Sequence, residues 1–215
     1  MIITIANQKG GVGKTTIATH FACIAAGKGH KTLLIDADLQ RSSMKFRDIR
    51  PDERSQFQAV SMVEPTIHRD VQSFEAEQIF IDVGGRYDKL FRSAFARSDA
   101  ALIPVCPSAY DIWALEDMLQ ILDELQLTRN IRVGIIFNQV QPHTIVSREA
   151  METLAEIARD FNIHLLNSRL YNRVAFKESA ERGLAVFEMT GEKYLKAGEE
   201  MLNLYQEVMT WLSSE

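Results

Sequence analysis

The sequence predicts an α/β fold of three layers, in which helices cover both faces of a mostly parallel central sheet. Short runs of β-branched and aliphatic residues alternate with segments of helical periodicity, which is the pattern of such sheets. The chain has 215 residues, of which 46% are hydrophobic and 25% charged, so it can bury a full core. It contains no internal repeat and no Gly/Ser-rich or Pro-rich linker, and we therefore expect a single domain over residues 1–215.

Five apolar runs are the clearest strand candidates, at residues 2–6, 32–36, 79–83, 100–105 and 131–137, with weaker ones at 57–62 and 163–166. Helices are expected at residues 15–28, 87–96, 111–125, 147–161, 174–182 and 191–212. The polar segment 41–56 is either a surface loop or a short helix. The last helix has one apolar face, which we expect to pack on the core: Met201, Leu204, Tyr205, Val208, Trp211 and Leu212.

The composition excludes several classes of protein. Lys and Arg together number 24 against 29 Asp and Glu, and a net charge of −5 excludes a uniformly basic surface that binds nucleic acid by net charge. Cys23 and Cys106 lie in apolar stretches, and we expect them in a helix and a core strand rather than in a disulfide or a zinc site. No stretch approaches the ~18 apolar residues of a membrane span, and no secretory leader is recognisable. We expect a cytoplasmic protein, with no helix-turn-helix segment before the first strand.

Residues 7–16, NQKGGVGKTT, follow the first strand and precede a helix, which is the context of a phosphate-binding P-loop. Glycines permit a tight turn that aims successive N–H groups at phosphate oxygens, and the helix N-terminus adds the positive end of its dipole. Lys14 would contact the β- and γ-phosphates of ATP, and the Thr15 hydroxyl would bind Mg²⁺. The motif's nucleotide-binding residues are Gly10, Gly11, Val12, Gly13, Lys14, Thr15 and Thr16.

The loop departs from the plain pattern, because Gln8 stands where glycine is required and a second lysine, Lys9, precedes the paired glycines. KGGVGKTT resembles the deviant Walker A signature of the ParA/MinD family of P-loop ATPases, and the chain is most similar to the small ParA/ParF-type partition ATPases. The resemblance implies that Lys9 reaches across an ATP-bound homodimer to the partner's phosphates. A cation supplied in trans would couple stabilisation of the transition-state charge to assembly.

A second resemblance to this family lies in LLIDADLQ, residues 33–40, which is similar to its D-x-D-x-Q switch I motif. It implies that Asp38 orients the attacking water, that Asp36 lies near the magnesium ion, and that Gln40 belongs to the switch. Carboxylates at positions i and i+2 of an extended segment face the same side, so both could approach the nucleotide. Either could instead simply cap a loop. With Lys9 and Lys14, Asp38 completes the expected catalytic set.

IFIDVGG, residues 79–85, is an apolar strand that ends in an acid and two glycines, as expected for a Walker B strand followed by switch II. Asp82 would hold Mg²⁺ through a water, and Thr15, Asp36 and Asp82 are therefore the expected metal-binding residues. Glycines at this point permit the backbone movement that a switch needs. Absence of the proline found in many relatives makes the segment more similar to the ParF-like ATPases.

Two further matches to the family are less specific. Residues 104–113 resemble the segment that contacts the dimer partner in ParF-like proteins, although its prolines could equally end a strand and start a helix. Asn138 matches the position whose amide pairs with adenine, and an amide offers the acceptor and donors that adenine's edge requires. A turn-forming asparagine is the alternative.

The resemblance implies an ATP-dependent dimer that binds DNA without sequence preference, associates with the nucleoid and acts in plasmid or chromosome partition or in cargo positioning. Hydrolysis is expected to be slow until a ParB-like or other small partner protein stimulates it. The DNA-contacting cations proposed are Arg169, Arg173, Lys177 and Lys196. The alternative is an ATP-gated switch that recruits a protein, or a MinD-like membrane or division-site switch, without DNA. The acidic character of the last helix argues against membrane binding.

Overall fold

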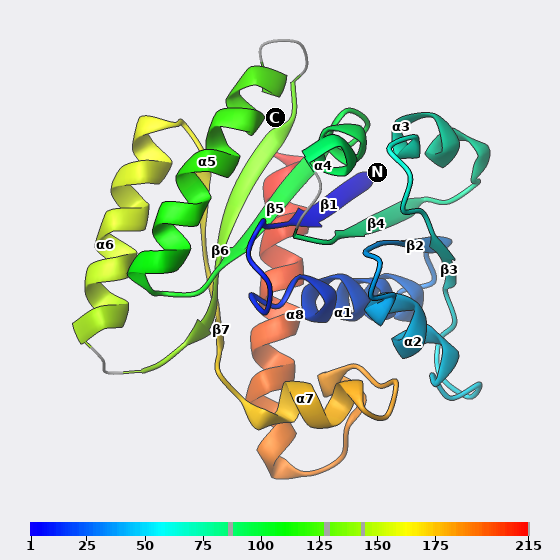
Figure 1. Ribbon diagram of the computed structural model, residues 1–215. Helices are drawn as coiled ribbons and strands as arrows, with labels where there is room; N and C mark the ends of the chain where they lie inside the picture. Colours follow the sequence, from blue (N-terminus) through cyan, green and yellow to red (C-terminus); the bar gives the residue numbers. More distant parts are fainter. Residues whose placement is uncertain (86–87, 127–129, 143–144, 215) are drawn as a thin grey trace.

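A sheet in which every pair of neighbouring strands is parallel forms the centre of the computed structural model, and helices cover both of its faces (Figure 1). The model describes residues 1–85, 88–126, 130–142 and 145–214. Within these residues the sheet has seven strands in the order β3-β2-β4-β1-β5-β6-β7. The expected three-layer α/β class is confirmed.

The strands are β1 (Ile2–Ala6), β2 (Thr32–Ala37), β3 (Gln58–Ser61), β4 (Gln78–Val83), β5 (Ala100–Val105), β6 (Arg132–Val140) and β7 (His164–Tyr171). The helices are α1 (Lys14–Gly27), α2 (Ser42–Asp48), α3 (Ile67–Asp70), α4 (Asp88–Phe95), α5 (Ala109–Gln126), α6 (Ile145–Asp160), α7 (Val174–Ala180) and α8 (Glu192–Ser213). Two short 3₁₀ turns, η1 (Val71–Ser73) and η2 (Val186–Glu188), complete the described elements.

Two apolar clusters, one on each face of the sheet, make up the core. Helices α3, α4, α5 and α6 pack on one face, and α1, α2, α7 and α8 pack on the other. Strands β1, β2, β4 and β5 lie between the two layers, which explains why their sequences are almost continuously apolar. The predicted apolar face of the last helix packs on this core, because Met201, Leu204, Tyr205 and Val208 are all buried.

The structure extends several predicted elements. β6 continues to Val140 and β7 to Tyr171, beyond their expected ends at residues 137 and 166, through polar residues that a hydrophobic pattern does not mark. β7 lies at the sheet edge, and the Glu207 carboxylate accepts hydrogen bonds of 2.7 Å from the backbone N–H groups of Asn167 and Ser168. This side chain satisfies backbone donors that a further strand would otherwise pair.

The structure settles one open alternative and corrects one expectation. The polar segment 41–56 contains a short helix, α2, and Cys106 is half-buried just after β5 rather than inside a core strand. Cys23 is buried in α1, where burial raises its thiol pKa to about 12. The predicted start of a helix at residue 87 lies outside the described residues. None of the helices that the structure describes is long and apolar enough to cross a bilayer.

The strand order brings three loops together at the carboxyl-terminal ends of the strands. β1 lies next to β4, β4 lies next to β2, and all three strands are parallel. The loops that follow them therefore leave the sheet on the same side. Asp36 in β2 and Asp82 in β4 are paired across neighbouring strands. Parallel α/β sheets bind ligands beyond the carboxyl ends of their strands, so a site is expected next to these three loops.

Candidate nucleotide-binding site

The loop between β1 and α1 has the backbone geometry of an anion cradle. Gly11 and Gly13 have positive φ angles of 79° and 89°, a conformation that glycine adopts without steric cost. Gly13 is also the N-cap of α1, so no side chain caps the first N–H groups of this helix. These donors, at the positive end of the helix dipole, are suited to phosphate oxygens.

Lys14, the residue after Gly13, is buried, with an exposed fraction of 8%. Its ammonium donates a hydrogen bond of 2.8 Å to the carbonyl oxygen of Lys9. Burial lowers the pKa of Lys14, and the negative charges of Asp82 and Asp38 act in the opposite direction. The ammonium is therefore held by the loop's own backbone, and the two carboxylates favour its charged form.

Asp82 lies against the start of α1. Its Oδ2 accepts hydrogen bonds of 2.7 Å from the Thr15 and Ser43 hydroxyls. Burial raises the Asp82 pKa to about 6, partly offset by those two hydroxyl donors. A carboxylate beside a hydroxyl is an oxygen donor set of the kind that Mg²⁺ prefers, so these residues fit the expected ion.

Asp36, the third residue expected to bind the metal, has a different environment. Its carboxylate is fully buried, and its oxygens accept hydrogen bonds from the backbone N–H groups of Met44 (2.8 Å) and Asp38 (3.1 Å). It therefore fixes the path of the chain from β2 into α2. Its role near a metal remains a prediction, and its contacts in this structure are with backbone.

Asp38 faces the P-loop cleft, together with Leu39 and Gln40. Its carboxylate lies so close to Gly84 that a Cβ at that position would be 2.7 Å from the Asp38 Cγ. Neither Gly84 nor Gly85 has a positive φ, so close approach explains why these positions are glycine. At Gly85 the backbone carbonyl of Gln8 occupies the space of a side chain. The loops after β1, β2 and β4 are thus in direct contact.

Two adjoining cavities extend from the P-loop. The first, of about 630 Å³, is lined by the P-loop, switch I and the two glycines after β4. The second, of about 350 Å³, lies between the P-loop and the segment from β7 to α7 and includes Asn138, Tyr171 and Phe176. Five residues line both cavities: Gly11, Gly13, Thr16, Gln139 and Lys177. The pair has the layout of a phosphate cleft joined to a space for a nucleoside.

Asn138 lies between these cavities and the P-loop backbone. Its amide nitrogen donates to the Val12 carbonyl at 2.6 Å, and it fills the space that a Gly13 side chain would need. The next residue, Gln139, has a φ of 53° and donates to the Gly11 carbonyl at 2.5 Å. Both side chains brace the P-loop. Adenine recognition by Asn138 stays a prediction.

Lys9 contacts its own chain in this structure. Its ammonium lies 2.7 Å from the Asp111 carboxylate at the start of α5. Beside this ion pair, Tyr110 and Trp113 are 73% and 62% exposed and pack edge to face. The segment expected to face a dimer partner therefore presents an exposed aromatic pair, next to the lysine expected to cross the interface.

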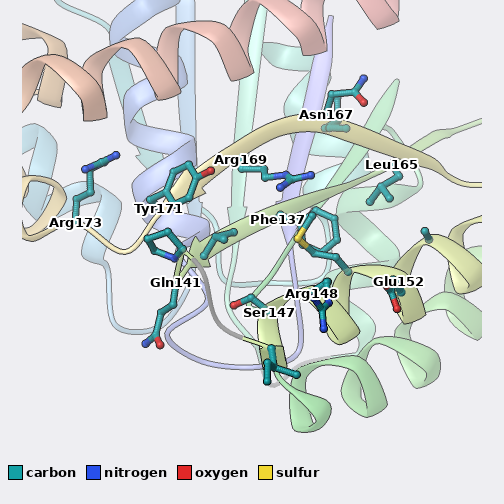
Figure 2. Close-up of a pocket in the computed structure, with 16 residues that line it drawn as sticks. Phe137, Gln141, Ser147, Arg148, Glu152, Leu165, Asn167, Arg169, Tyr171 and Arg173 are labelled. Carbon is teal, nitrogen blue, oxygen red and sulfur yellow. The ribbon is translucent and has the colours of Figure 1, made fainter.

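Among the four cations expected to contact DNA, Arg173 lines one cavity with Arg169 and another with Lys177. Arg169 and Arg173 line a groove of about 1090 Å³ between α6 and β7, and Figure 2 shows Arg148 of α6 across from them. Arg173 is paired with Glu200 at 2.5 Å, whereas Arg148 and Arg169 have no ion-pair partner within the described residues. Lys177 lines the nucleotide cavities, and Lys196 is exposed on α8.

Sequence reasoning did not identify Ser43, Asp111 or Gln139 as parts of the site. Ser43 lies in a polar segment with no distinguishing pattern. Asp111 follows Ser108 by three residues at the start of an apolar helix, a capping pattern that could have marked it. Gln139 is recognisable only from its positive φ, which the sequence does not show.

The glycine loop, the buried lysine and the two adjoining cavities at the carboxyl edge of a parallel sheet define a P-loop nucleotide-binding protein. The chain belongs to the family of the CobQ/CobB/MinD/ParA nucleotide binding domain, whose model matches residues 3–186. The ParA/MinD resemblance of the motifs is thereby confirmed.

Among curated proteins, the maintenance of carboxysome distribution protein A of Halothiobacillus neapolitanus is 26% identical over 96% of this chain and 95% of its own length. Protein ParA of Rhizobium radiobacter is 23% identical over 89% and 98%. Among solved structures, MinD of Aquifex aeolicus superposes with a TM-score of 0.77 at 20% identity, covering 97% of both chains. An ATP complex of a variant of McdA from Cyanothece gives 0.78 at 16% identity, covering 97% and 96%.

Proposed function

We propose that residues 1–215 form a single ATPase domain that acts as a Mg²⁺-dependent switch of the ParA type, dimeric with ATP and slow to hydrolyse it alone. The observation that supports this most is the convergence of Lys14, the Thr15–Asp82 pair and Asp38 on one cleft. When bound, Mg²⁺ would neutralise phosphate charge. Lys14 and the α1 N-terminus would hold the phosphates, and Asp38 would orient the attacking water.

Homodimerisation is part of this proposal. Lys9 lies beside the exposed Tyr110 and Trp113, and aromatic residues of this kind are typical of the centre of protein interfaces. In the dimer, Lys9 would contact the partner's nucleotide and act as a cation supplied in trans. A ParB-like or other small activating protein would then complete or stabilise this arrangement, and we expect slow turnover in its absence.

We further propose that the ATP dimer binds DNA without sequence preference and positions a DNA or protein cargo on the nucleoid. The relatives named for carboxysome distribution and for ParA support a positioning role. Arg148 and Arg169 are exposed and lack ion-pair partners in the described part of the chain, so they are available to phosphates. Dimerisation doubles this set, which would couple DNA affinity to ATP despite the net charge of −5.

A second candidate is an ATP-gated switch that recruits a protein instead of DNA. The α6–β7 groove favours it, because the apolar residues Phe137, Met151 and Leu165 line that groove together with its arginines. A membrane role has less support, because the apolar face of α8 is buried in the core. No membrane partner is proposed.

Fluorescence anisotropy with a random-sequence DNA duplex separates the two candidates. The protein is titrated with ATP, with ADP and without nucleotide, each across a salt series. Binding with ATP alone that weakens steeply with salt is the expected result. An ATP dimer that binds no DNA in any state would contradict the DNA role and favour protein recruitment.

A further inference from the structure

Lys9 is held to its own protomer by an ion pair that the proposed dimer must alter. Its ammonium donates to Asp111 Oδ2 at 2.7 Å, although the two residues are 102 positions apart in the chain. The Asp111 side chain is 4% exposed, whereas that of Lys9 is 38% exposed. The carboxylate is therefore buried behind the lysine, and the lysine lies at the surface.

The backbone of Lys9 is also fixed, so its side chain is aimed at Asp111. The Lys9 N–H donates to Asn7 Oδ1 at 2.9 Å, and its carbonyl accepts from Lys14. Asn7 in turn donates to the carbonyl of Pro104 at 2.9 Å. The first turn of the P-loop is thereby tied to the end of β5, and Asp111 lies in the first turn of α5, the next element along the chain.

Asp111 depends on Lys9 for its charge compensation. The Ser108 hydroxyl donates to the same oxygen, Oδ2. The other oxygen, Oδ1, is buried and has no hydrogen-bond partner among the described residues. Among the described residues, withdrawing the ammonium leaves this buried carboxylate with one side-chain donor, the Ser108 hydroxyl. Breaking a buried pair by removing one partner is costly. For Lys9 to leave Asp111, another anion must therefore attract its ammonium more strongly than Asp111 does.

We propose that Asp111 competes with nucleotide phosphates for the Lys9 ammonium and thereby makes dimerisation selective for ATP over ADP. The inference rests on the proposed function, in which Lys9 contacts the nucleotide of the partner. Attraction between charges grows with the charge of the anion, so the additional phosphate of ATP competes with Asp111 where ADP does not. Asp111 is in this account a specificity-determining residue.

A purely structural role for Asp111 makes a different prediction. An acidic residue in the first turn of a helix stabilises that helix through its dipole, and Ser108 with Asp111 has the spacing of a capping pair. Loss of such a cap would lower the melting temperature. It would leave the preference for ATP over ADP unchanged.

The test is sedimentation velocity of wild type and Asp111→Asn, with ATP, with ADP and without nucleotide, over a range of nucleotide concentration. Asparagine keeps the size of the side chain and removes its charge. We expect the wild type to dimerise with ATP only, and Asp111→Asn to dimerise with ADP as well and to need at least about tenfold less ATP. Asp123→Asn, an exposed position on the same helix, should behave as wild type.

Two further variants make the result specific. The double variant Lys9→Ala with Asp111→Asn should lose the ADP-induced dimer, since the effect acts through Lys9. Asp111→Ser carries the same expectation as Asp111→Asn should that variant unfold. Unchanged selectivity in folded Asp111→Asn, or an ADP dimer that persists without Lys9, would overturn the inference. A wild type that stays monomeric with ATP would contradict the proposed function itself, and the inference with it.

Discussion

Thr15 Oγ1 and Asp82 Oδ2 lie 2.7 Å apart, and this contact joins the start of α1 to the end of β4. It exists because β1 and β4 are neighbouring parallel strands, so the P-loop and the Walker B acid leave the sheet at the same edge. A hydroxyl and a carboxylate at this distance present two oxygens to one small region of the cleft. The charge of Asp82 should therefore influence the binding of Mg²⁺ and, with it, of the nucleotide.

Nucleotide affinity in the presence of Mg²⁺ should depend on the ionisation of Asp82. Burial raises its pKa to about 6, so the carboxyl becomes neutral as the pH falls below 6 and loses its attraction for a cation. Below this pH we expect affinity for a fluorescent ATP analogue to fall by up to about tenfold per pH unit. Phosphate groups titrate in the same range, so the comparison is with Asp82→Asn. Identical pH profiles in the two proteins would contradict the prediction.

Gly84→Ala should impair hydrolysis more than ATP binding. A methyl group at this position would lie 2.7 Å from the Asp38 Cγ and would displace the carboxylate expected to orient water. We expect turnover to fall at least about tenfold, because misplacing a catalytic group by about an ångström has this effect. Gly27→Ala is the matched control, since a methyl group there would meet no atom of another described segment closer than the Ser55 hydroxyl at 3.9 Å. Steady-state phosphate release from both variants checks the prediction, and normal turnover in Gly84→Ala would exclude it.

Lys177 should contribute to nucleotide affinity rather than to DNA affinity. It lines both cavities beside the P-loop and has no ion-pair partner within the described residues. We expect Lys177→Gln to weaken ATP binding about tenfold, as loss of one charged contact commonly does. Lys196→Gln, on the exposed side of α8, should leave it unchanged. Calorimetric titration of both variants with ATP tests this, and equal affinities would return Lys177 to the DNA-contacting set.

His20 should make the fold sensitive to acid. Its Nε2 accepts from the backbone N–H of Val186 at 3.0 Å, so the proton is on Nδ1, which donates to the Thr16 carbonyl at 2.7 Å. Burial lowers its pKa to about 4. The unfolded chain therefore binds a proton between pH 6.5 and 4 that the folded chain excludes, and the free energy of unfolding falls as the pH drops.

The loss attributable to His20 over this range is about 3 kcal/mol at most. His20→Gln, although less stable at pH 7, should show a flatter decline in urea unfolding between pH 6.5 and 4. The exposed His30→Gln serves as control and should keep the slope of the wild type. An unchanged slope in His20→Gln would assign the acid sensitivity to other groups.

The sequence predicted most of the sheet because its central strands are buried on both faces. Five strands fall where apolar runs mark them, and the P-loop lies in its predicted context. It predicted less at the sheet edge, where β7 contains Asn167 and Arg169 and is stabilised by side chains from α8. There the hydrogen-bond partners, rather than the local pattern, decide the length of the strand.

Within the site, chemistry that resides in a contiguous motif was predictable and contacts between distant segments were not. The glycine loop determines the positions of Lys14 and Thr15. By contrast, Lys9 in the P-loop pairs with Asp111 in α5, and Gly84 after β4 lies against Asp38 in the loop after β2. Arg173 was expected to face DNA, and its guanidinium is paired with Glu200, which lies 27 residues further along the chain in α8. Such pairings follow from tertiary packing.

Dimerisation of this chain should require ATP rather than ADP, and it should require Lys9. The most direct measurement is the sedimentation of Asp38→Ala, in which hydrolysis should be blocked, with ATP, with ADP and without nucleotide, alongside Lys9→Ala in the same background. We expect a dimer with ATP alone and a monomer in every state once Lys9 is replaced. An ATP-bound chain that remains monomeric, or a dimer that forms regardless of nucleotide, would rule out an ATP-dependent switch that acts through Lys9.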